Sequence, residues 1–474
     1  MSCCCGDPEG FPPGRKGVPF LGCAPFVGSD APRAFFNWSK DYGSIMSVRM
    51  GKKTWVVLND YDSMYQAFIE QQSKASSRPL IPLLDQYNEG LGLGSVRYGE
   101  FFKANRSFGE KILRGAGIGA QTIEERVIEE SGFLVDAIKA KSGKSFTTRF
   151  PLNNASCNVL WSILFGERAD YDDASFNRLI SALCKTINED PGFPSTAISL
   201  MGLTPSLMNF PLFKGVNEEY LQNFKNLLKV FADIIDKHKE TYSEKFSRGF
   251  VDAYVKEVKK GTPHFSYEQL VQFARELFNA GAQPTAGMVG WGLLCLIHYP
   301  ETQKKLRAEI NKVIGKGKVT TSSKASMPYT NAFIQELMRF RTMVIFTVPH
   351  ETTEDMDLKG FKIPKGTTVL GNVWGVNNHP DYWEHAEKFD PERFIDENGD
   401  FIKSDHVVSY GIGGPRDCIG YHVAQLEIFI MLVSMVRKFE FLPDPDASDL
   451  PPIDKGAIGA FFIPALHKLV AKEI

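Results

Sequence analysis

The stretch that decides the fold is Tyr410-Gly-Ile-Gly-Gly-Pro-Arg-Asp-Cys-Ile-Gly420, called here the cysteine loop, because it places one thiol, Cys418, inside a glycine-rich segment. Its glycines let the backbone turn tightly and approach a flat ligand closely. Arg416 is a fixed cation that can pair with a carboxylate and favour the thiolate form of Cys418. Residues 423–436 are apolar and predict a helix, whose N-terminal end also favours an anion. The loop therefore suits a thiolate metal ligand, although a structural cysteine has the same pattern.

Length and composition indicate one large globular unit. The chain has 474 residues and a net charge of -2, and no linker, repeat or low-complexity run divides it. We therefore expect a single domain over residues 1–474, with residues 1–10 as a disordered tail. Without a basic block, nucleic acid is excluded as a partner. The eight cysteines have neither metal-site nor disulfide-framework spacing, which fits a reducing compartment.

The N-terminal residues carry no recognisable targeting segment. They contain neither the apolar core of a signal peptide nor a membrane span, which needs about 20 apolar residues. We expect a cytoplasmic protein with at most peripheral membrane contact. Cys3, Cys4 and Cys5 are placed for palmitoylation, which would give reversible contact, and an exposed unmodified tail is the alternative.

The cysteine loop resembles the haem-binding loop of the cytochrome P-450 family, in which an aromatic residue precedes Gly-x-Arg-x-Cys-x-Gly. Gly414, Arg416, Cys418 and Gly420 match this pattern, and the aromatic residue, Tyr410, lies one residue further from the cysteine than the pattern has it. The resemblance implies a mainly α fold with small β-sheets, a triangular prism of helices that encloses haem b. It also implies that Cys418 is the ligand of the haem iron.

A second motif occurs in the order that the family has. Glu336 and Arg339 share a helix face at i,i+3 spacing, which alone would indicate a surface ion pair of little worth. Arg393 follows in Phe389-Asp-Pro-Glu-Arg-Phe394. The resemblance implies that the three charges form a buried triad that locks the cysteine loop.

Other positions are assigned by resemblance to the haem pocket. Arg106 follows Phe102 by four residues in a helical stretch that runs to about residue 114, so the two share a face. The family has tryptophan in place of Phe102, and a phenyl ring cannot donate its hydrogen bond, so only Arg106 carries over as a propionate contact. His350 is expected to contact a propionate too. The expected substrate contacts are Val344, Phe346, Thr347 and Val348.

Two segments outside these motifs have clear expectations. Residues 44–59 alternate in polarity around a glycine and predict a β-hairpin. Interruptions rich in proline and glycine at residues 190–194 and 205–211 correspond to the substrate-access lid of the family. Apolar residues near them are suited either to lipid contact or to inward packing.

The main departure from the family lies in Phe278-Asn-Ala-Gly-Ala-Gln-Pro-Thr285. Monooxygenases of the family have Ala-Gly-x-Asp/Glu-Thr-Thr/Ser here, which delivers protons to dioxygen. Gln283 replaces the acid and cannot ionise. Pro284 replaces the alcohol and leaves the carbonyl of Ala280 without its helical partner, so we expect the helix to bend or open. Thr285 matches the last position, and a shift by one residue would let its hydroxyl substitute.

Asn279 is the second clue to function. The Phe-Asn-Ala run resembles the distal helix of P-450s that metabolise fatty acid hydroperoxides, namely allene oxide synthases, hydroperoxide lyases and epoxyalcohol synthases, in which the asparagine binds the peroxide. Their following Gly-Gly pair is absent. An asparagine that bonds a helix carbonyl is the alternative.

Three functional hypotheses result. In the first, the enzyme isomerises or dehydrates polyunsaturated fatty acid hydroperoxides without dioxygen, NADPH or a reductase; Asn279 orients the peroxide, and Gly281 and Pro284 make room for it. In the second, a monooxygenase hydroxylates a lipophilic substrate with a reductase, and its proton relay runs through Thr285 and water. The third, a haem protein without catalysis, has least support because thiolate ligation favours O–O cleavage.

Overall fold

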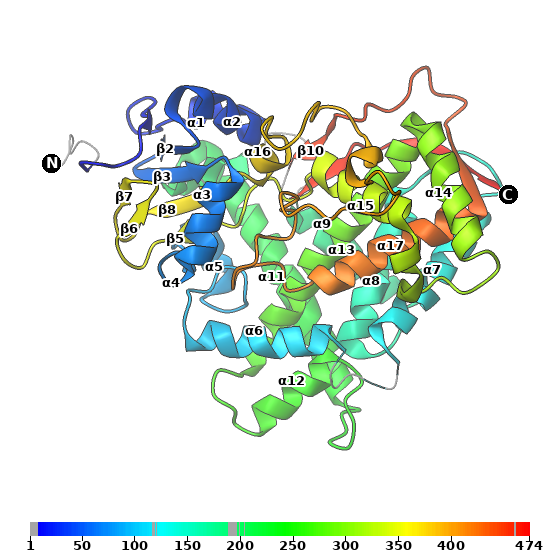
Figure 1. Ribbon diagram of the computed structural model, residues 1–474. Coiled ribbons are helices and arrows are strands. Elements are labelled where there is room, and N and C mark those ends of the chain that lie inside the picture. Colours follow the sequence, from blue (N-terminus) through cyan, green and yellow to red (C-terminus); the bar gives the residue numbers. More distant parts are fainter. Residues whose placement is uncertain are drawn as a thin grey trace.

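The computed structural model describes residues 8–474 apart from 116–118, 120, 188–196, 199, 203 and 459–460. Helices make up most of the molecule, and a small sheet lies at one side (Figure 1). The expected fold class, mainly α with small β-sheets, is confirmed. The expected lid interruption at residues 190–194 lies outside the described residues.

The core is built around α13 (Tyr267–His298), which begins at a Ser266 cap whose hydroxyl accepts from the backbone N–H of Gln269. This helix is apolar on nearly every face, which is the pattern of a buried helix. It packs against α8 (Arg149–Phe165), α11 (Pro211–Lys239) and α17 (Tyr421–Lys438), as Figure 1 shows. Among the described residues it is the one helix long and apolar enough to cross a membrane, and 78% of that apolar stretch is buried inside the protein.

Pro284 does not interrupt α13, which continues from Tyr267 to His298. The expected opening of the helix at this residue is therefore wrong. A proline in mid-helix costs about 3 kcal/mol because it removes one hydrogen bond and crowds the preceding turn. The residues on both sides, Ala282, Thr285 and Ala286, are buried, and their packing offsets that cost.

The remaining helices surround this core. A capping box starts α7 (Ile123–Lys139), in which Thr122 and Glu125 exchange side-chain and backbone hydrogen bonds. The helices predicted after the cysteine loop and around Arg106 correspond to α17 and to α6 (Glu100–Leu113). The further α-helices are α1 (Ala24–Val27), α2 (Ala31–Tyr42), α3 (Tyr61–Tyr65), α4 (Gln72–Ala75), α5 (Pro82–Asn88), α6 (Glu100–Leu113), α7 (Ile123–Lys139), α9 (Ala174–Ile187), α12 (Phe250–Lys259), α14 (Pro300–Val313), α15 (Pro328–Phe340) and α16 (Val373–Asn377), with single turns at Gln66–Glu70, Pro205–Asn209, Thr321–Ser326 and Pro391–Phe394.

The strands of the largest sheet are β1 (Gly14–Arg15), β2 (Ile45–Met50), β3 (Lys53–Leu58), β8 (Thr368–Gly371) and β5 (His350–Glu351), and they lie side by side in this order. The antiparallel β2–β3 pair confirms the predicted hairpin, and Gly51 turns it at a φ of +61°, which glycine adopts without strain. The smaller sheets contain β4 (Phe146–Thr147), β12 (Lys468–Glu473) and β9 (Phe439–Pro443); β6 (Met356–Leu358) and β7 (Phe361–Ile363); and β10 (Gly456–Ile458) and β11 (Phe462–Pro464).

Residues 8–10 of the N-terminal segment make backbone hydrogen bonds. The backbone N–H of Phe11 donates to the carbonyl of Pro8 (3.0 Å), and that of Lys362 donates to the carbonyl of Gly10 (2.8 Å). The expected disorder is therefore wrong for residues 8–10. Cys3, Cys4 and Cys5 lie outside the described residues.

Candidate haem site

The cysteine loop is held by its own aspartate. The carboxylate of Asp417 accepts hydrogen bonds from the backbone N–H groups of Ile412 (3.0 Å) and Gly413 (2.6 Å). Gly411 has a φ of +114°, and a Cβ added there would lie 2.1 Å from Oδ1 of Asp417. Only glycine fits that position, and the loop presents Cys418 immediately before α17.

The thiol of Cys418 lies in a recess, accessible to solvent yet surrounded by protein, and the recess is also lined by Arg106, Tyr410 and Asp417. Burial raises the pKa of Cys418, and the N–H of Gly420 and the charge of Arg106 oppose that rise. Arg416 is not among the groups that shift this pKa, because its guanidinium donates to backbone carbonyls away from the thiol. The expectation that Arg416 favours the thiolate is therefore wrong. A bound metal ion deprotonates a coordinating thiol.

Arg416 points away from the thiol. Its Nε donates to the carbonyl of Ser76 (2.8 Å) and its Nη2 to that of Val96 (2.6 Å). The guanidinium lies over the ring of Phe102, 3.7 Å from the ring centroid. Phe102 therefore supports Arg416 by a cation–π contact, a role that needs no indole hydrogen.

Arg78 is a buried basic residue near Arg416 that the sequence analysis did not identify. It is buried, and its guanidinium donates to the carbonyls of Gly94 (3.0 Å) and Val348 (2.9 Å). A single arginine before a proline belongs to no motif, so nothing in the sequence marked it. It joins the loop that follows α5 to the segment before β5.

Three basic residues, the buried Arg78 and His350 and the half-buried Arg416, repel one another. Burial, and then Arg416 and Arg106, hold the pKa of Arg78 well below its usual value, and burial with Arg78 and Arg416 does the same for His350. His350 donates from Nδ1 to the carbonyl of Ala75 (2.6 Å). Among the described residues no acidic side chain contributes to these two shifts, so the group suits an anionic ligand. The two propionates of a haem fit this chemistry.

Arg106 has a role in holding the cysteine loop. Its Nη1 donates to the backbone carbonyl of Asp417 (2.8 Å), and its Nε pairs with Glu110 (2.7 Å). The predicted propionate contact of Arg106 stays a prediction.

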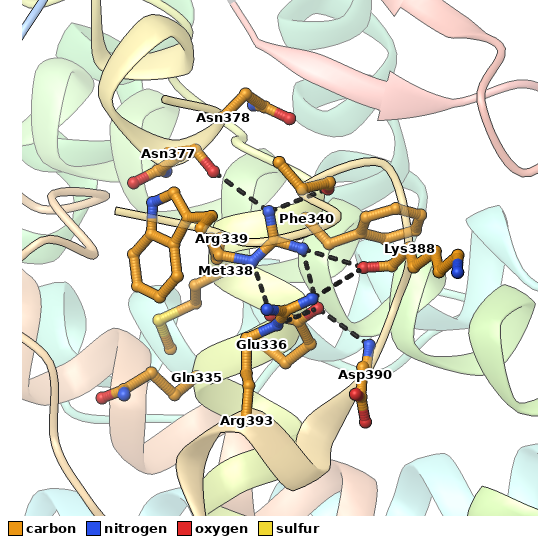
Figure 2. Close-up of polar contacts among 12 residues, drawn as sticks. Gln335, Glu336, Met338, Arg339, Phe340, Asn377, Asn378, Lys388, Asp390 and Arg393 are labelled. Carbon is orange, nitrogen blue, oxygen red and sulfur yellow. Dashed lines mark hydrogen bonds and ion pairs between the residues drawn. The ribbon is translucent and has the colours of Figure 1, made fainter. Parts of the chain in front are cut away.

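The predicted triad is assembled as Figure 2 shows. Glu336 and Arg339 are fully buried and joined at 2.6 Å and 2.7 Å, and Nε of Arg393 reaches Glu336 at 3.2 Å. The backbone N–H of Asp390 adds a fourth bond to Glu336 (2.9 Å). The buried carboxylate is thus surrounded by donors, as its burial requires.

The triad connects to the cysteine loop through Asn377. Arg339 donates to the carbonyl of Asn377 (3.0 Å), and the side-chain oxygen of Asn377 accepts from the backbone N–H of Val408 (3.2 Å). Ser409 donates to the carbonyl of Met338 (3.0 Å). These bonds tie α15 to the two residues that precede the loop, which is the arrangement that the predicted lock requires.

Ala280 on α13 is exposed, whereas most of this helix is buried, and the neighbouring Asn279 is half-buried. The buried Oδ1 atom of Asn279 has no hydrogen-bond partner among the described residues. If Asn279 donated from its NH2 group to a helix carbonyl, the alternative role, its amide oxygen would still be free to accept a hydrogen bond from a ligand.

The other predicted distal residues differ in their surroundings. A Cβ on Gly281 would lie 2.7 Å from Leu160 of α8, so this glycine permits close helix packing and the expectation that it makes room for a peroxide is wrong. Gln283 lines a small cavity together with Arg149 and His467. Thr285 is 3% exposed.

The four predicted substrate residues divide into two pairs. Phe346 packs against Phe35, with ring centroids 5.5 Å apart, and Oγ1 of Thr347 accepts from the backbone N–H of Gly371 (2.9 Å). These two side chains hold the sheet and α2. Val344 is half-buried and Val348 is 46% exposed, and their contact with substrate stays a prediction.

This thiol loop, triad and helical fold define a haem-thiolate enzyme, and the chain belongs to the cytochrome P450 family: the family model "Cytochrome P450" matches residues 12–470. It is 34% identical to human cytochrome P450 2J2, over 98% of this chain and 91% of that one. It is 33% identical to bovine cytochrome P450 2U1 (91% and 79% covered) and 31% identical to canine cytochrome P450 2C21 (97% and 94%). The predicted family is confirmed, and it implies a haem iron cofactor.

Proposed function

We propose that this protein rearranges polyunsaturated fatty acid hydroperoxides, either by isomerisation to an epoxyalcohol or by loss of water to an allene oxide. The observation that carries the proposal is the distal face of α13. It offers the amide of Asn279, whose buried oxygen has no partner among the described residues, and it lacks the acid and the alcohol that dioxygen activation uses. A hydroperoxide brings oxygen that is already reduced.

The residues of the site fit bound haem b, which would supply, through its iron on Cys418, the chemistry that cleaves the O–O bond. Asn279 would hold the substrate, because its amide oxygen can accept from the peroxide O–H and its NH2 group can donate to a peroxide oxygen. Pro284 carries no hydroxyl or N–H, so it offers no proton at this point of the helix. Isomerisation conserves every atom of the substrate, and dehydration releases one water.

The test uses purified, haem-loaded protein with a linoleate hydroperoxide and no reductant. We expect loss of the conjugated-diene absorbance and an epoxyalcohol or allene oxide product. Asn279→Ala should lower turnover by about 5- to 30-fold, because the loss of a hydrogen bond between neutral groups costs roughly 1–2 kcal/mol. Peroxide left intact by the wild-type protein would exclude this function.

A second candidate function is a monooxygenase that acts on a lipophilic substrate with a reductase partner. The similarity over nearly the whole chain to cytochromes P450 2J2 and 2C21 supports this candidate more than the first. Thr285 would then carry the relay, although its side chain is almost fully buried. Oxygen consumption driven by NADPH and a reductase, abolished in Thr285→Val, would support it.

Peripheral contact with a membrane belongs to both candidates. Phe20, Phe26, Phe210 and Leu212 are 79%, 46%, 57% and 60% exposed. The segment with Phe20 and Phe26 and the segment with Phe210 and Leu212 are linked through Gly51. The N–H of Gly51 donates to the carbonyl of Leu21, and a Cβ added to Gly51 would lie 3.1 Å from Thr204. Exposed apolar side chains of this kind suit a lipid surface.

A further inference from the structure

Arg275 on α13 is a buried cation whose hydrogen bonds to the described residues are few and long. The residue is 4% exposed. Among the described residues its Nη2 makes two contacts, both 3.4 Å long, to Oδ1 of Asn88 and Oε1 of Glu276, and its Nε has no partner. A guanidinium has five N–H donors, and ordinary hydrogen bonds are about 2.9 Å long. Arg275 is therefore poorly satisfied for a buried charge.

Arg339 shows how a buried structural arginine differs. Its guanidinium makes bonds of 2.6 Å and 2.7 Å to Glu336 and bonds of 3.0 Å to the carbonyls of Asn377, Ala386 and Lys388. Burying a charge without such partners costs free energy. The contrast indicates that Arg275 is placed for a ligand.

Glu276 does not satisfy this cation. Its Oε2 accepts from the backbone N–H groups of Leu93 (2.6 Å) and Gly94 (3.1 Å), so the carboxylate is used to hold the loop after α5. Its other oxygen is the one 3.4 Å from Arg275. A second carboxylate would meet donors that are still available.

The surroundings of Arg275 are apolar. Its guanidinium lies over the ring of Phe224, 4.4 Å from the centroid, and Phe224 belongs to a buried cluster with Leu83, Met201 and Phe213, contributed by α5, α11 and the segment between α9 and α11. Arg275 and Asn279 are four residues apart, so they share a face of α13 and are about 6 Å apart along its axis. The cation of Arg275 and the amide of Asn279 thus lie on the same face of α13, and apolar side chains surround the cation.

We propose that Arg275 binds the carboxylate of a long-chain acid, whose hydrocarbon chain runs along α13 toward Asn279. The inference rests on the proposed function only in taking a fatty acid derivative as the substrate. Planar guanidinium and carboxylate groups pair through two parallel hydrogen bonds. Arg275 then selects free acids over their esters and alcohols.

The test measures equilibrium binding of linoleic acid and of its methyl ester, neither of them peroxidised, to haem-loaded protein. We expect the wild-type protein to favour the acid. Arg275→Met should weaken acid binding about tenfold or more, since truncating one partner of a desolvated charge pair costs at least about 1.4 kcal/mol, and should change ester binding less than twofold. Arg275→Lys should keep part of the acid preference.

The control is Lys229→Met, which removes an exposed cation of α11 that pairs with Asp233 and should change the binding of neither ligand. Equal losses of acid and ester in Arg275→Met, or wild-type protein that does not distinguish them, would overturn the assignment. The binding test contains no peroxide, so it is independent of hydroperoxide turnover. A protein that prefers the acid but does not convert hydroperoxides would contradict the proposed function and leave the role of Arg275 intact.

Discussion

At the scale of single residues, Gly281 has two possible roles, helix packing and catalysis, which a substitution can distinguish. A Cβ added there would lie 2.7 Å from Leu160. Alanine gains about 1 kcal/mol over glycine in helix propensity, but overpacking a core costs about 1–3 kcal/mol. We expect Gly281→Ala to lower the free energy of unfolding by about 1 kcal/mol, as measured by denaturant unfolding.

The matched test of that role is the double variant. Leu160→Val shortens the side chain that the new methyl group would meet, so Gly281→Ala should be less destabilising in the Leu160→Val background. Additive effects in this cycle, with a loss of turnover at unchanged stability, would instead return Gly281 to the catalytic role that its position in the family pattern suggested.

Phe102 gives a second prediction at this scale, because it supports Arg416 with a cation–π contact at 3.7 Å. Phe102→Leu keeps most of the apolar volume and removes the aromatic face, so we expect a loss of about 1–2 kcal/mol in stability. Haem should also dissociate faster, as followed by transfer to an acceptor protein. The control is Phe108→Leu on the same helix, whose ring contacts Phe250 and Tyr254 rather than a cation; faster haem loss there too would contradict the prediction.

At the scale of elements, the junction of α15 with the cysteine loop depends on one carboxylate. Glu336 accepts from Arg339, Arg393 and the N–H of Asp390. Glu336→Gln leaves buried cations without their partner, which typically costs 3–5 kcal/mol. We expect thermal unfolding at a much lower temperature and loss of haem on dialysis.

The control for this junction is an ion pair at the surface. Lys305→Met breaks the exposed pair between Lys305 and Glu392, and it should change the free energy of unfolding by about 0–1 kcal/mol. A Glu336→Gln protein that unfolds at the wild-type temperature and keeps its haem would show that the triad does not hold the cysteine loop.

Local patterns predicted these elements well, and spatial relations between elements less well. The cysteine loop, the triad and the β2–β3 hairpin are visible in the chain because each needs particular residues at short spacing. Arg78 and Arg275 were invisible because a buried cation is defined by what distant segments place around it. The contact of Gly281 with Leu160 of α8 and the continuity of α13 at Pro284 depend on how the helices pack. No local sequence pattern encodes that packing.

At the scale of the whole molecule, the packed helices α7, α8, α13 and α17 enclose two buried acids. Glu130 of α7 accepts from Tyr171 (2.5 Å) and pairs with Arg168 (2.9 Å), and burial raises the pKa of Glu130 to about 7. Burial also raises the pKa of Glu427 on α17 well above its usual value. The interior of this bundle therefore favours protonated carboxyl groups.

This arrangement predicts how stability depends on pH. A carboxyl group whose pKa is higher in the folded than in the unfolded chain binds more protons when folded, so its contribution is complete below the unfolded value of 4.5 and declines as pH rises to about 7. The Glu130→Gln variant keeps a neutral group at all pH values, so its free energy of unfolding, measured with denaturant from pH 4.5 to 7, should fall less steeply than that of the wild type. The neighbouring exposed Glu129→Gln should keep the wild-type slope. Identical slopes for wild type and Glu130→Gln would mean that Glu130 is already ionised in the folded protein, held by Arg168 and Tyr171 strongly enough to outweigh its burial.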